Sequence, residues 1–251
     1  MMAAGICANN GAEVVLFEKN GMLGKKLRIT GKGRCNITNA CGMATFMENV
    51  TTNGKFLYSV INQFSPKDTI NFFKKNGLDV KIERGNRVFP QSDKAIDIVH
   101  VMENFVKKSN CKILNERVKN LIIQSGKCCG VETFNSEKIY SDAVIIATGG
   151  MSYPKTGATG DGYKIANRVG HTIVELRPSL VPLESNSDHC SKMQGLSLKN
   201  VSLELVEKIS DKVIYKDFGE MLFTHFGVSG PIILSSSAHM TNNKNYYIKI
   251  D

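Results

Sequence analysis

The sequence is best understood from residues 141–163, which run Ser141-Asp142-Ala143-Val144-Ile145-Ile146-Ala147-Thr148-Gly149-Gly150-Met151-Ser152-Tyr153-Pro154-Lys155-Thr156-Gly157-Ala158-Thr159-Gly160-Asp161-Gly162-Tyr163. The apolar run 143–147 stops abruptly at Thr-Gly-Gly, which is typical of a strand buried on both faces of a parallel sheet whose carboxyl end opens onto a ligand crevice. Three more glycines precede a helical pattern that starts at Tyr163, so backbone N–H groups can approach a large polar ligand without a Cβ in the way. These residues therefore predict a nucleotide-cofactor site at a strand end.

A second glycine-rich segment, residues 19–36, contains cations and no carboxylate. Glycines interleaved with positive charges suit a phosphate-bearing ligand better than a nucleic-acid duplex, and an ordinary solvated loop is the alternative interpretation. The cations are Lys19, Lys25, Lys26, Arg28, Lys32 and Arg34, and the glycines are Gly21, Gly24, Gly31 and Gly33.

The first 18 residues predict a helix and a strand that ends in an acid. Residues 1–9 form the expected helix, Gly11 ends it, and residues 12–18 form a buried strand that closes on Glu18. In a dinucleotide-binding βαβ unit such an acid accepts a hydrogen bond from a ribose hydroxyl, about 20 residues after a glycine turn. A solvated strand-end carboxylate is an equal alternative for Glu18. Counting back puts the glycine turn ahead of Met1, so we expect the chain to begin inside the first helix.

The remaining patterns predict scaffold elements. Ser65 caps a helix with Pro66 at its first position, and Ser92 caps a second helix with one apolar face. Residues 78–83 and 88–90 alternate as strands, and residues 118–140 predict an antiparallel ribbon. With the run 143–147, these elements indicate a doubly wound, Rossmann-like α/β domain over residues 1–178 that lacks its first strand.

Residues 179–251 predict the start of an inserted antiparallel β-rich domain. Strict alternation marks a strand at 201–206, with further strands expected at 180–183, 213–215 and 221–223. Gly230-Pro231 opens a short helix, and the polar segment 186–194 is expected to be a loop.

Length and composition restrict the class of protein. The chain has 251 residues, 42% hydrophobic and 22% charged, as in soluble globular proteins, and no apolar run approaches the roughly 20 residues of a membrane span. The amino terminus has no basic leader, so we expect a cytoplasmic protein. Seven cysteines without paired spacing favour reduced thiols over a disulfide framework or a metal site.

The net charge of +9 raises the hypothesis of a nucleic-acid partner. The lysines are spread along the chain, however, and no nucleic-acid motif or tryptophan accompanies them, so a generally basic surface is favoured and no nucleic acid is expected.

Five segments together resemble the BaiN/RdsA family of NAD(P)/FAD-dependent oxidoreductases, in the right order over most of the chain. They are Val15-Leu16-Phe17-Glu18-Lys19-Asn20, residues 24–39 around Gly31-Lys32-Gly33-Arg34-Cys35-Asn36, Arg87-Val88-Phe89-Pro90, residues 147–157 from Ala147-Thr148-Gly149-Gly150, and residues 223–231 around His225.

The resemblance implies positions for an FAD cofactor. It places the adenosine ribose at Glu18, the adenine against the backbone of Val118, and the cofactor crevice at Thr148, Gly149 and Gly150. Lys19 is also expected to bind the cofactor. It also implies that the diphosphate and flavin are lined by Lys26, Arg28, Gly33, Arg34, Cys35 and Asn36. Asp161 has two interpretations left open, a hydrogen bond to the cofactor or a turn residue before a helix.

The resemblance implies oxidoreduction of a small organic substrate with NAD(P)H as electron donor. The catalytic residues remain unassigned: His225 is favoured as a structural histidine over a proton donor, and Cys35 as a packed thiol over a redox-active one, since no second cysteine lies at CxxC spacing. The family's first strand, its glycine turn and a late cofactor-binding segment are not matched, so we expect a chain truncated at both ends. A catalytically silent fragment and a basic nucleic-acid-binding module are the competing hypotheses.

Overall fold

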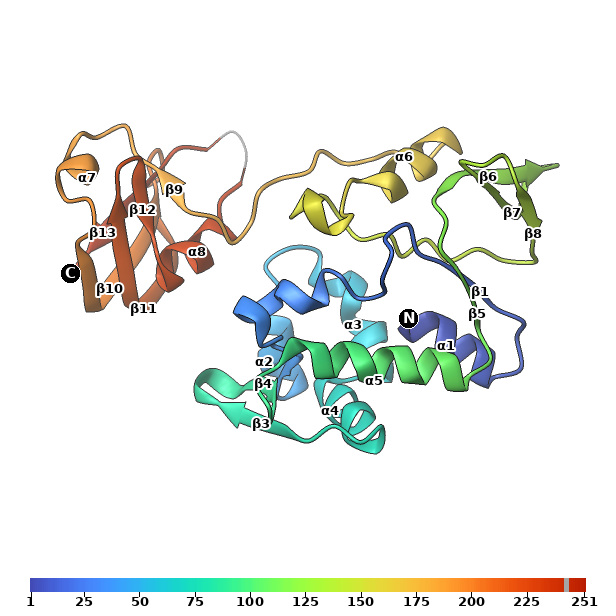
Figure 1. The fold of residues 1–251 in the computed structure, drawn as a ribbon. Coiled ribbons are helices and arrows are strands. Elements are labelled where there is room, and N and C mark those ends of the chain that lie inside the picture. Colours follow the sequence, from blue (N-terminus) through green and yellow to red (C-terminus); the bar gives the residue numbers. More distant parts are fainter. Residues whose placement is uncertain (242–243) are drawn as a thin grey trace. The chain divides into compact units, whose positions relative to one another are not determined.

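The computed structural model describes residues 1–241 and 244–251, which divide into two compact units, 1–174 and 175–251 (Figure 1). Unit 1 contains α1 (Met2–Asn9), β1 (Val15–Phe17), the 3₁₀ segment η1 (Leu27–Gly33), β2 (Thr38–Asn39), α2 (Met43–Glu48), α3 (Gly54–Gln63), α4 (Pro66–Lys75), β3 (Val80–Glu83), η2 (Arg84–Asn86), β4 (Arg87–Pro90), α5 (Ala95–Lys108), β5 (Lys112–Leu114), β6 (Val118–Gln124), β7 (Lys127–Thr133), β8 (Lys138–Tyr140), η3 (Pro154–Thr156) and α6 (Asp161–Arg168). Unit 2 contains β9 (Leu183–Glu184), α7 (His189–Lys192), β10 (Ser197–Glu207), β11 (Lys212–Thr224), β12 (Gly227–Ser229), α8 (Pro231–Ser237) and β13 (Tyr246–Ile250).

The mixed α/β class is confirmed, and its parallel part is the pair β1 and β5. These strands align Val15 with Lys112 and Phe17 with Leu114. The pairing continues one residue further, where Glu18 N donates to Leu114 O at 3.0 Å. The carboxyl ends of two strands that are far apart in sequence therefore meet at one edge, where Glu18 follows β1.

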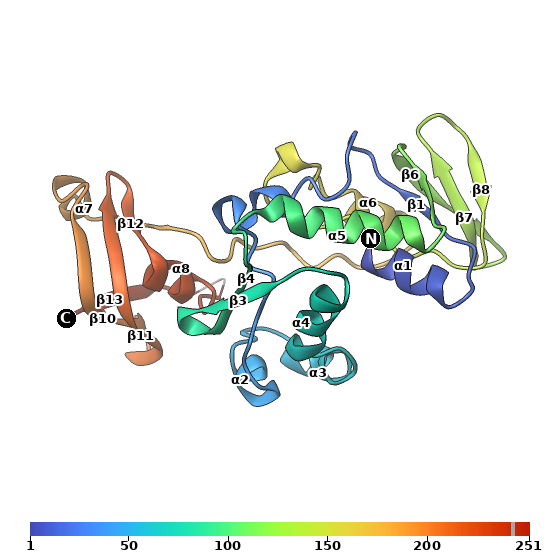
Figure 2. The same ribbon diagram turned by 60° about the horizontal axis from the view of Figure 1, so that its bottom comes forward.

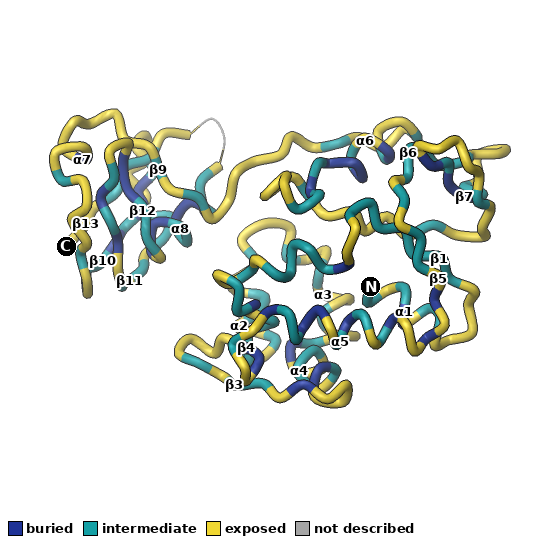
Figure 3. Tube along the Cα trace, in the orientation of Figure 1, coloured by how far each residue is buried: buried dark blue, intermediate teal, exposed yellow. Residues whose placement is uncertain are grey.

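Helix α1 lies alongside the C-terminal part of α5 in both views of the ribbon (Figures 1 and 2). The close approach depends on Gly5, because a Cβ there would lie 2.2 Å from Phe105 Cε1. Helix α5 also buries Ile98, Val99 and Val106. Buried positions recur along this helix (Figure 3). The predicted apolar face of this helix is confirmed.

Gly5→Ala is expected to lower the free energy of unfolding by about 2 kcal/mol, because the added methyl overpacks the contact with the Phe105 ring. Urea unfolding followed by circular dichroism measures the change. Gly21→Ala is the matched control, since a Cβ at Gly21 meets nothing within 4 Å. An equal decrease in the free energy of unfolding of both variants would show that the contact with Phe105 does not cause the destabilisation.

The helix starts follow the local chemistry only in part. Ser65 caps α4 in a reciprocal capping box with Asp68, with Pro66 in the first turn, as predicted. Ser92 does not cap α5: the N-cap is Lys94, and the Ser92 hydroxyl accepts from Lys94 N and donates to Asp97 instead. The predicted ribbon is confirmed as the antiparallel sheet β6-β7-β8, and β2-β4-β3 forms another.

The expectation of a buried strand at residues 143–147 is wrong. This segment has no strand pairing in the part of the chain that the structure describes, and Ile145 is 63% exposed. The β-branched run favours extended backbone, but a strand also needs a neighbour that completes its hydrogen bonds. Among the described residues, β1 pairs only with β5, so no adjacent strand is present to hold 143–147 in the sheet.

Unit 2 is a five-stranded antiparallel sheet in the order β13-β10-β11-β12-β9, with α8 packed on β11. Its centre is formed by fully buried Leu203, Leu205 and Ile233. The two strands expected at 213–215 and 221–223 are one continuous strand, β11, and the expected loop at 186–194 contains the short helix α7. Register shifts in the β10–β11 pairing let the long strand bend.

Three expectations concern membranes, metals and thiols. Among the described helices none is long and apolar enough to cross a bilayer. The same residues contain no group of three or more His, Cys, Asp or Glu side chains suited to a metal ion. All seven cysteines are free thiols.

Candidate functional site

The end of β1 meets the glycine-rich turn before α6. Glu18 Oε1 accepts hydrogen bonds from Asn20 N at 2.8 Å and from Asn20 Nδ2 at 2.7 Å. The same Nδ2 donates to Thr156 O at 3.3 Å, and a Cβ at Gly157 would lie 2.6 Å from it. Glu18 Oε2 has no hydrogen-bond donor among the described residues, so the carboxylate retains an acceptor while its orientation is fixed.

Asp161 joins three segments of unit 1. Its carboxylate accepts from Lys19 Nζ at 2.8 Å, from Arg117 Nε at 3.0 Å and Arg117 Nη2 at 2.8 Å, and from Thr159 Oγ1 at 3.1 Å. Its side chain is only 10% exposed. The Arg117 guanidinium, followed by Lys19, holds the pKa of Asp161 well below its ordinary value despite partial burial. Both oxygens are used by the protein, so the contacts favour the turn interpretation of Asp161 over a cofactor contact.

Residues 148–150 lie against this turn. Gly160 N donates to Gly150 O at 3.3 Å, and a Cβ at Gly162 would lie 2.5 Å from Thr148 Oγ1. Gly149 adopts a φ of +73°, which favours glycine, and a Cβ there would meet nothing within 4 Å. The Thr-Gly-Gly segment therefore packs on α6 through Thr148 and leaves open space beside Gly149.

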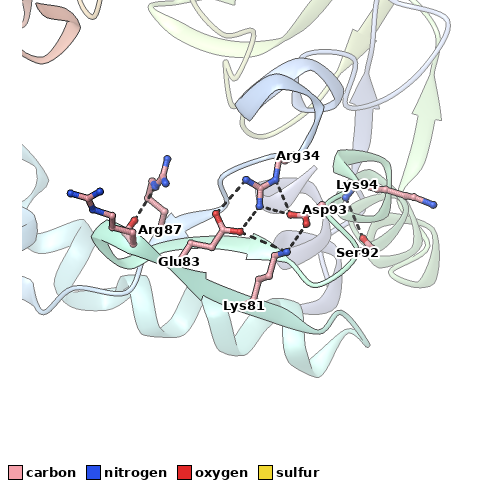
Figure 4. A network of polar contacts seen from close by, with 8 residues as sticks. Arg34, Lys81, Glu83, Arg87, Ser92, Asp93 and Lys94 are labelled. Atoms are coloured by element: carbon pink, nitrogen blue, oxygen red, sulfur yellow. Dashed lines mark hydrogen bonds and ion pairs between the residues drawn. The ribbon is translucent and has the colours of Figure 1, made fainter. Parts of the chain in front are cut away.

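The basic glycine segment reaches the same region through Lys26 and ends in a separate cluster at Arg34. Lys26 Nζ donates to Ser152 O at 3.2 Å. Arg28 Nε is buried and has no hydrogen-bond partner among the described residues. Arg34 instead bonds to Glu83 and Asp93, on strand β3 and just before α5 (Figure 4).

Cys35, next to Arg34, is 3% exposed and belongs to the core cluster around Phe73 and Ala95. Burial raises the pKa of its thiol. Gly33 and Cys35 both have positive φ, at 86° and 58°, and a Cβ at Gly31 would lie 3.1 Å from Asn36 N. The contacts of Cys35 are those of a packed thiol.

A groove of about 240 Å³ opens beside Glu18. It is lined by Glu18, Asn20, Gly21, Met22, Leu23, Glu103, Lys107, Ile113 and Asn115. Val118 does not line it; this residue begins β6 and pairs with Thr133. In unit 2, His225 lies in the turn between β11 and β12, with its ring edge-on to Phe226.

The structure thus brings together three of the predicted places and separates a fourth. The end of β1 contacts the turn 156–161 through Lys19 and Asn20, and Gly160 in that turn contacts Gly150. Lys26 of the basic segment contacts Ser152, whereas Arg34 bonds to Glu83 and Asp93, and Cys35 packs in the core with Phe73 and Ala95. Asn115 and Arg117 were not predicted. The short strand 112–114 could have indicated them, because a parallel partner of β1 must end beside Glu18. The residues that follow this strand have the pattern of an antiparallel ribbon, which hid the parallel pairing.

These features fit a dinucleotide. Glu18 offers a free carboxylate oxygen to a ribose hydroxyl, and Arg28 offers a buried donor without an acceptor, which an anionic phosphate would satisfy. The open space at Gly149 lets a ligand approach the backbone closely.

Comparison with known proteins identifies relatives of this chain. The chain is 28% identical over 244 residues to 3-dehydro-bile acid delta(4,6)-reductase of Clostridium scindens, which covers 96% of this chain and 58% of that protein. It is 27% identical over 242 residues to a ribosomal RNA dihydrouridine synthase of Escherichia coli, with 95% and 58% covered. The chain therefore spans less than two thirds of the length of these curated relatives.

The solved structures that resemble this one are distant. A glycine oxidase from Bacillus cereus aligns with a TM-score of 0.36 at 11% identity over 82% of this chain and 60% of that chain. A flavin-dependent halogenase from Xanthomonas campestris aligns with a TM-score of 0.30 at 9% identity over 99% and 58%. The family model of the HI0933-like protein Rossmann domain matches residues 1–235. This match covers most of the chain and confirms the resemblance found in its motifs: the chain belongs to the HI0933-like Rossmann-domain family.

Proposed function

We propose that this chain forms the FAD-binding part of an oxidoreductase that is reduced by NAD(P)H and acts on a small organic substrate. The observation that carries the proposal is the convergence of the β1 end, the turn 156–161 and residues 150–152. The end of β1 lies far in sequence from the other two segments, and Glu18 there supplies an acceptor suited to a ribose hydroxyl. Family membership and the flavin-type motifs support the same cofactor.

Different residues of the chain would bind different parts of the cofactor. Glu18 would accept from the ribose hydroxyls through Oε2, with Asn20 fixing the carboxylate. Arg28 and Lys26 would face the diphosphate, and the backbone at Gly149 and Gly150 would approach the ring system. When bound, the flavin supplies the hydride chemistry, so the protein needs only to bind, orient and shield it.

The relatives do not select a substrate. The names of two of them refer to a bile acid and to ribosomal RNA, which differ greatly in size and charge. RNA is a second candidate because the chain carries a net charge of +9 and two relatives, from Escherichia coli and Haemophilus influenzae, are named for RNA. We retain a small organic molecule as the first proposal because the lysines are spread along the sequence and are not gathered in one segment.

A chain that holds no flavin is the alternative function, and one observation favours it. The run 143–147 is unpaired among the described residues, so the parallel sheet consists of β1 and β5 alone. A dinucleotide site at a sheet crevice usually rests on more strands than two.

The visible absorbance spectrum of the purified chain separates these candidates. The proposal predicts a yellow protein that holds about one FAD per chain, and bleaching under anaerobic NADH or NADPH identifies the donor. A colourless, folded chain that takes up no added FAD would support the silent alternative. Tight, salt-sensitive retention of RNA by a flavin-free chain would instead favour the RNA candidate.

A further inference from the structure

The guanidinium of Arg34 uses four of its five N–H donors within the protein. Its Nε and Nη2 donate to Asp93 Oδ1 at 2.8 and 2.5 Å, while Nη2 and Nη1 donate to the two Glu83 oxygens at 2.5 and 3.3 Å (Figure 4). Lys81 Nζ completes the cluster with Asp93 Oδ2 at 2.5 Å. The flat face of the guanidinium lies 4.2 Å from the Phe89 ring centroid. An arginine with all three nitrogens on carboxylates and its face on an aromatic ring has little left to offer a ligand.

The backbone around Arg34 is strained. Lys32 and Cys35 adopt positive φ values of 56° and 58°, which non-glycine residues rarely do, and Gly31 and Gly33 are also in this region. Such conformations persist where the surroundings over-determine them. Here three contacts hold the segment: the Arg34 cluster, the buried Cys35 side chain, and the bond from Ile37 N to Val88 O at 2.8 Å.

We propose that Arg34 is a positioning residue, whose ion cluster with Glu83 and Asp93 locks residues 30–36 so that the neighbouring Arg28 faces the anionic part of the dinucleotide. The identity of the ligand rests on the proposed function, whereas the locking of residues 30–36 by the ion cluster does not. The cluster joins residues 49 and 59 positions away in sequence, so it fastens the glycine segment to β3 and to the turn before α5. The segment's phosphate-facing cations are then Arg28 and Lys26.

The lock is tested on the flavin-free chain by the reactivity of Cys35. Arg34→Met and the double variant Glu83→Gln/Asp93→Asn are each expected to speed alkylation of Cys35 about tenfold, measured peptide by peptide with mass spectrometry, because a loosened segment opens more often. Arg87→Met is the matched control, since the Arg87 guanidinium carbon lies 5.7 Å from the Phe89 ring centroid and Arg87 bonds only to Arg84 O within the described residues. Unchanged Cys35 protection in both test variants would overturn the lock.

The positioning role is tested by the sign of the effect on FAD affinity. If Arg34 bound the diphosphate directly, Glu83→Gln/Asp93→Asn would free a cation and remove two negative charges, so affinity would rise. The positioning role predicts a fall of about tenfold and a changed visible circular dichroism of the flavin at saturation. Arg34→Lys discriminates further, because a lysine keeps the charge but cannot bridge both carboxylates.

The two proposals can fail separately. If the chain binds no FAD but Cys35 is alkylated faster in the variants, the lock stands and the proposed function is overturned. If the chain binds FAD and its FAD affinity rises in Glu83→Gln/Asp93→Asn, or is unchanged in Arg34→Lys, the proposed function stands and the positioning role is overturned.

Discussion

Asp161→Ala is expected to lower the free energy of unfolding of unit 1 by about 3 kcal/mol, because it removes the largely buried carboxylate that Lys19 and Arg117 share. Lys19 is 22% exposed at its side chain and Arg117 is 44% exposed, so water relieves part of the cost and the loss stays at the lower end for a broken buried pair. The variant also removes the Lys19–Asp161 contact between the end of β1 and the turn before α6, while the Asn20–Thr156 hydrogen bond remains. Urea unfolding monitored by far-ultraviolet circular dichroism measures the loss.

Glu132→Ala is the matched control within the same unit. Glu132 pairs with Lys119 at 3.8 Å and accepts from Asn120, and it is more exposed than Asp161. Its removal is expected to cost less than about 1 kcal/mol. If the two variants lost equal stability, the Asp161 cluster would be no more than a surface ion pair.

The same carboxylate predicts a pH dependence. The folded-state pKa of Asp161 lies well below the unfolded value of about 3.9, mainly because Arg117 donates to it, so folded chains bind fewer protons than unfolded ones in the acid range. The stabilisation by Asp161 is therefore complete above about pH 5. It is lost as the pH falls below the pKa of the unfolded state and through the lower pKa of the folded state. The difference between the wild type and Asp161→Ala should stay constant from about pH 7 to about pH 5 and shrink below about pH 4. A difference that stayed constant down to about pH 2 would contradict the assignment.

Features encoded by neighbouring residues could be predicted. The N-cap at Ser65, the apolar face of α5 and the acidic end of β1 each depend on residues that are close together in sequence. For these elements, local propensity and tertiary structure agree.

Features that depend on a distant partner could not be predicted from local pattern. The run 143–147 has the residues of a strand, yet pairing decides whether one forms, and no described strand lies beside it. The Lys19–Asp161 pair joins residues 142 positions apart, and a charged residue's pattern does not reveal its partner. Arg34 illustrates the same point. Its sequence neighbours indicated a phosphate ligand, whereas its guanidinium donates hydrogen bonds to Glu83 and Asp93.

Arg28→Met is expected to weaken FAD binding by about 10- to 100-fold, because a charge-assisted hydrogen bond to phosphate contributes about 1.5–3 kcal/mol. The buried Nε that lacks a partner in the described chain would be satisfied only when the diphosphate is present. Fluorescence titration of FAD measures the affinity. Lys32→Met is the matched control, since Lys32 is an exposed cation in the same segment and is expected to change the affinity less than about threefold.

The stability of the flavin-free chain gives this prediction its sharpest form. A buried donor without an acceptor costs free energy, so removing it should leave the unfolding temperature of the free protein unchanged or raise it. A cation kept for a ligand therefore shows opposite effects of Arg28→Met on the free and the bound protein, whereas a purely structural arginine would lower stability in both. A lower unfolding temperature of the free variant with intact FAD affinity would show that Arg28 supports the fold, and the diphosphate would then need another partner, for which Lys26 is the nearest cation in sequence.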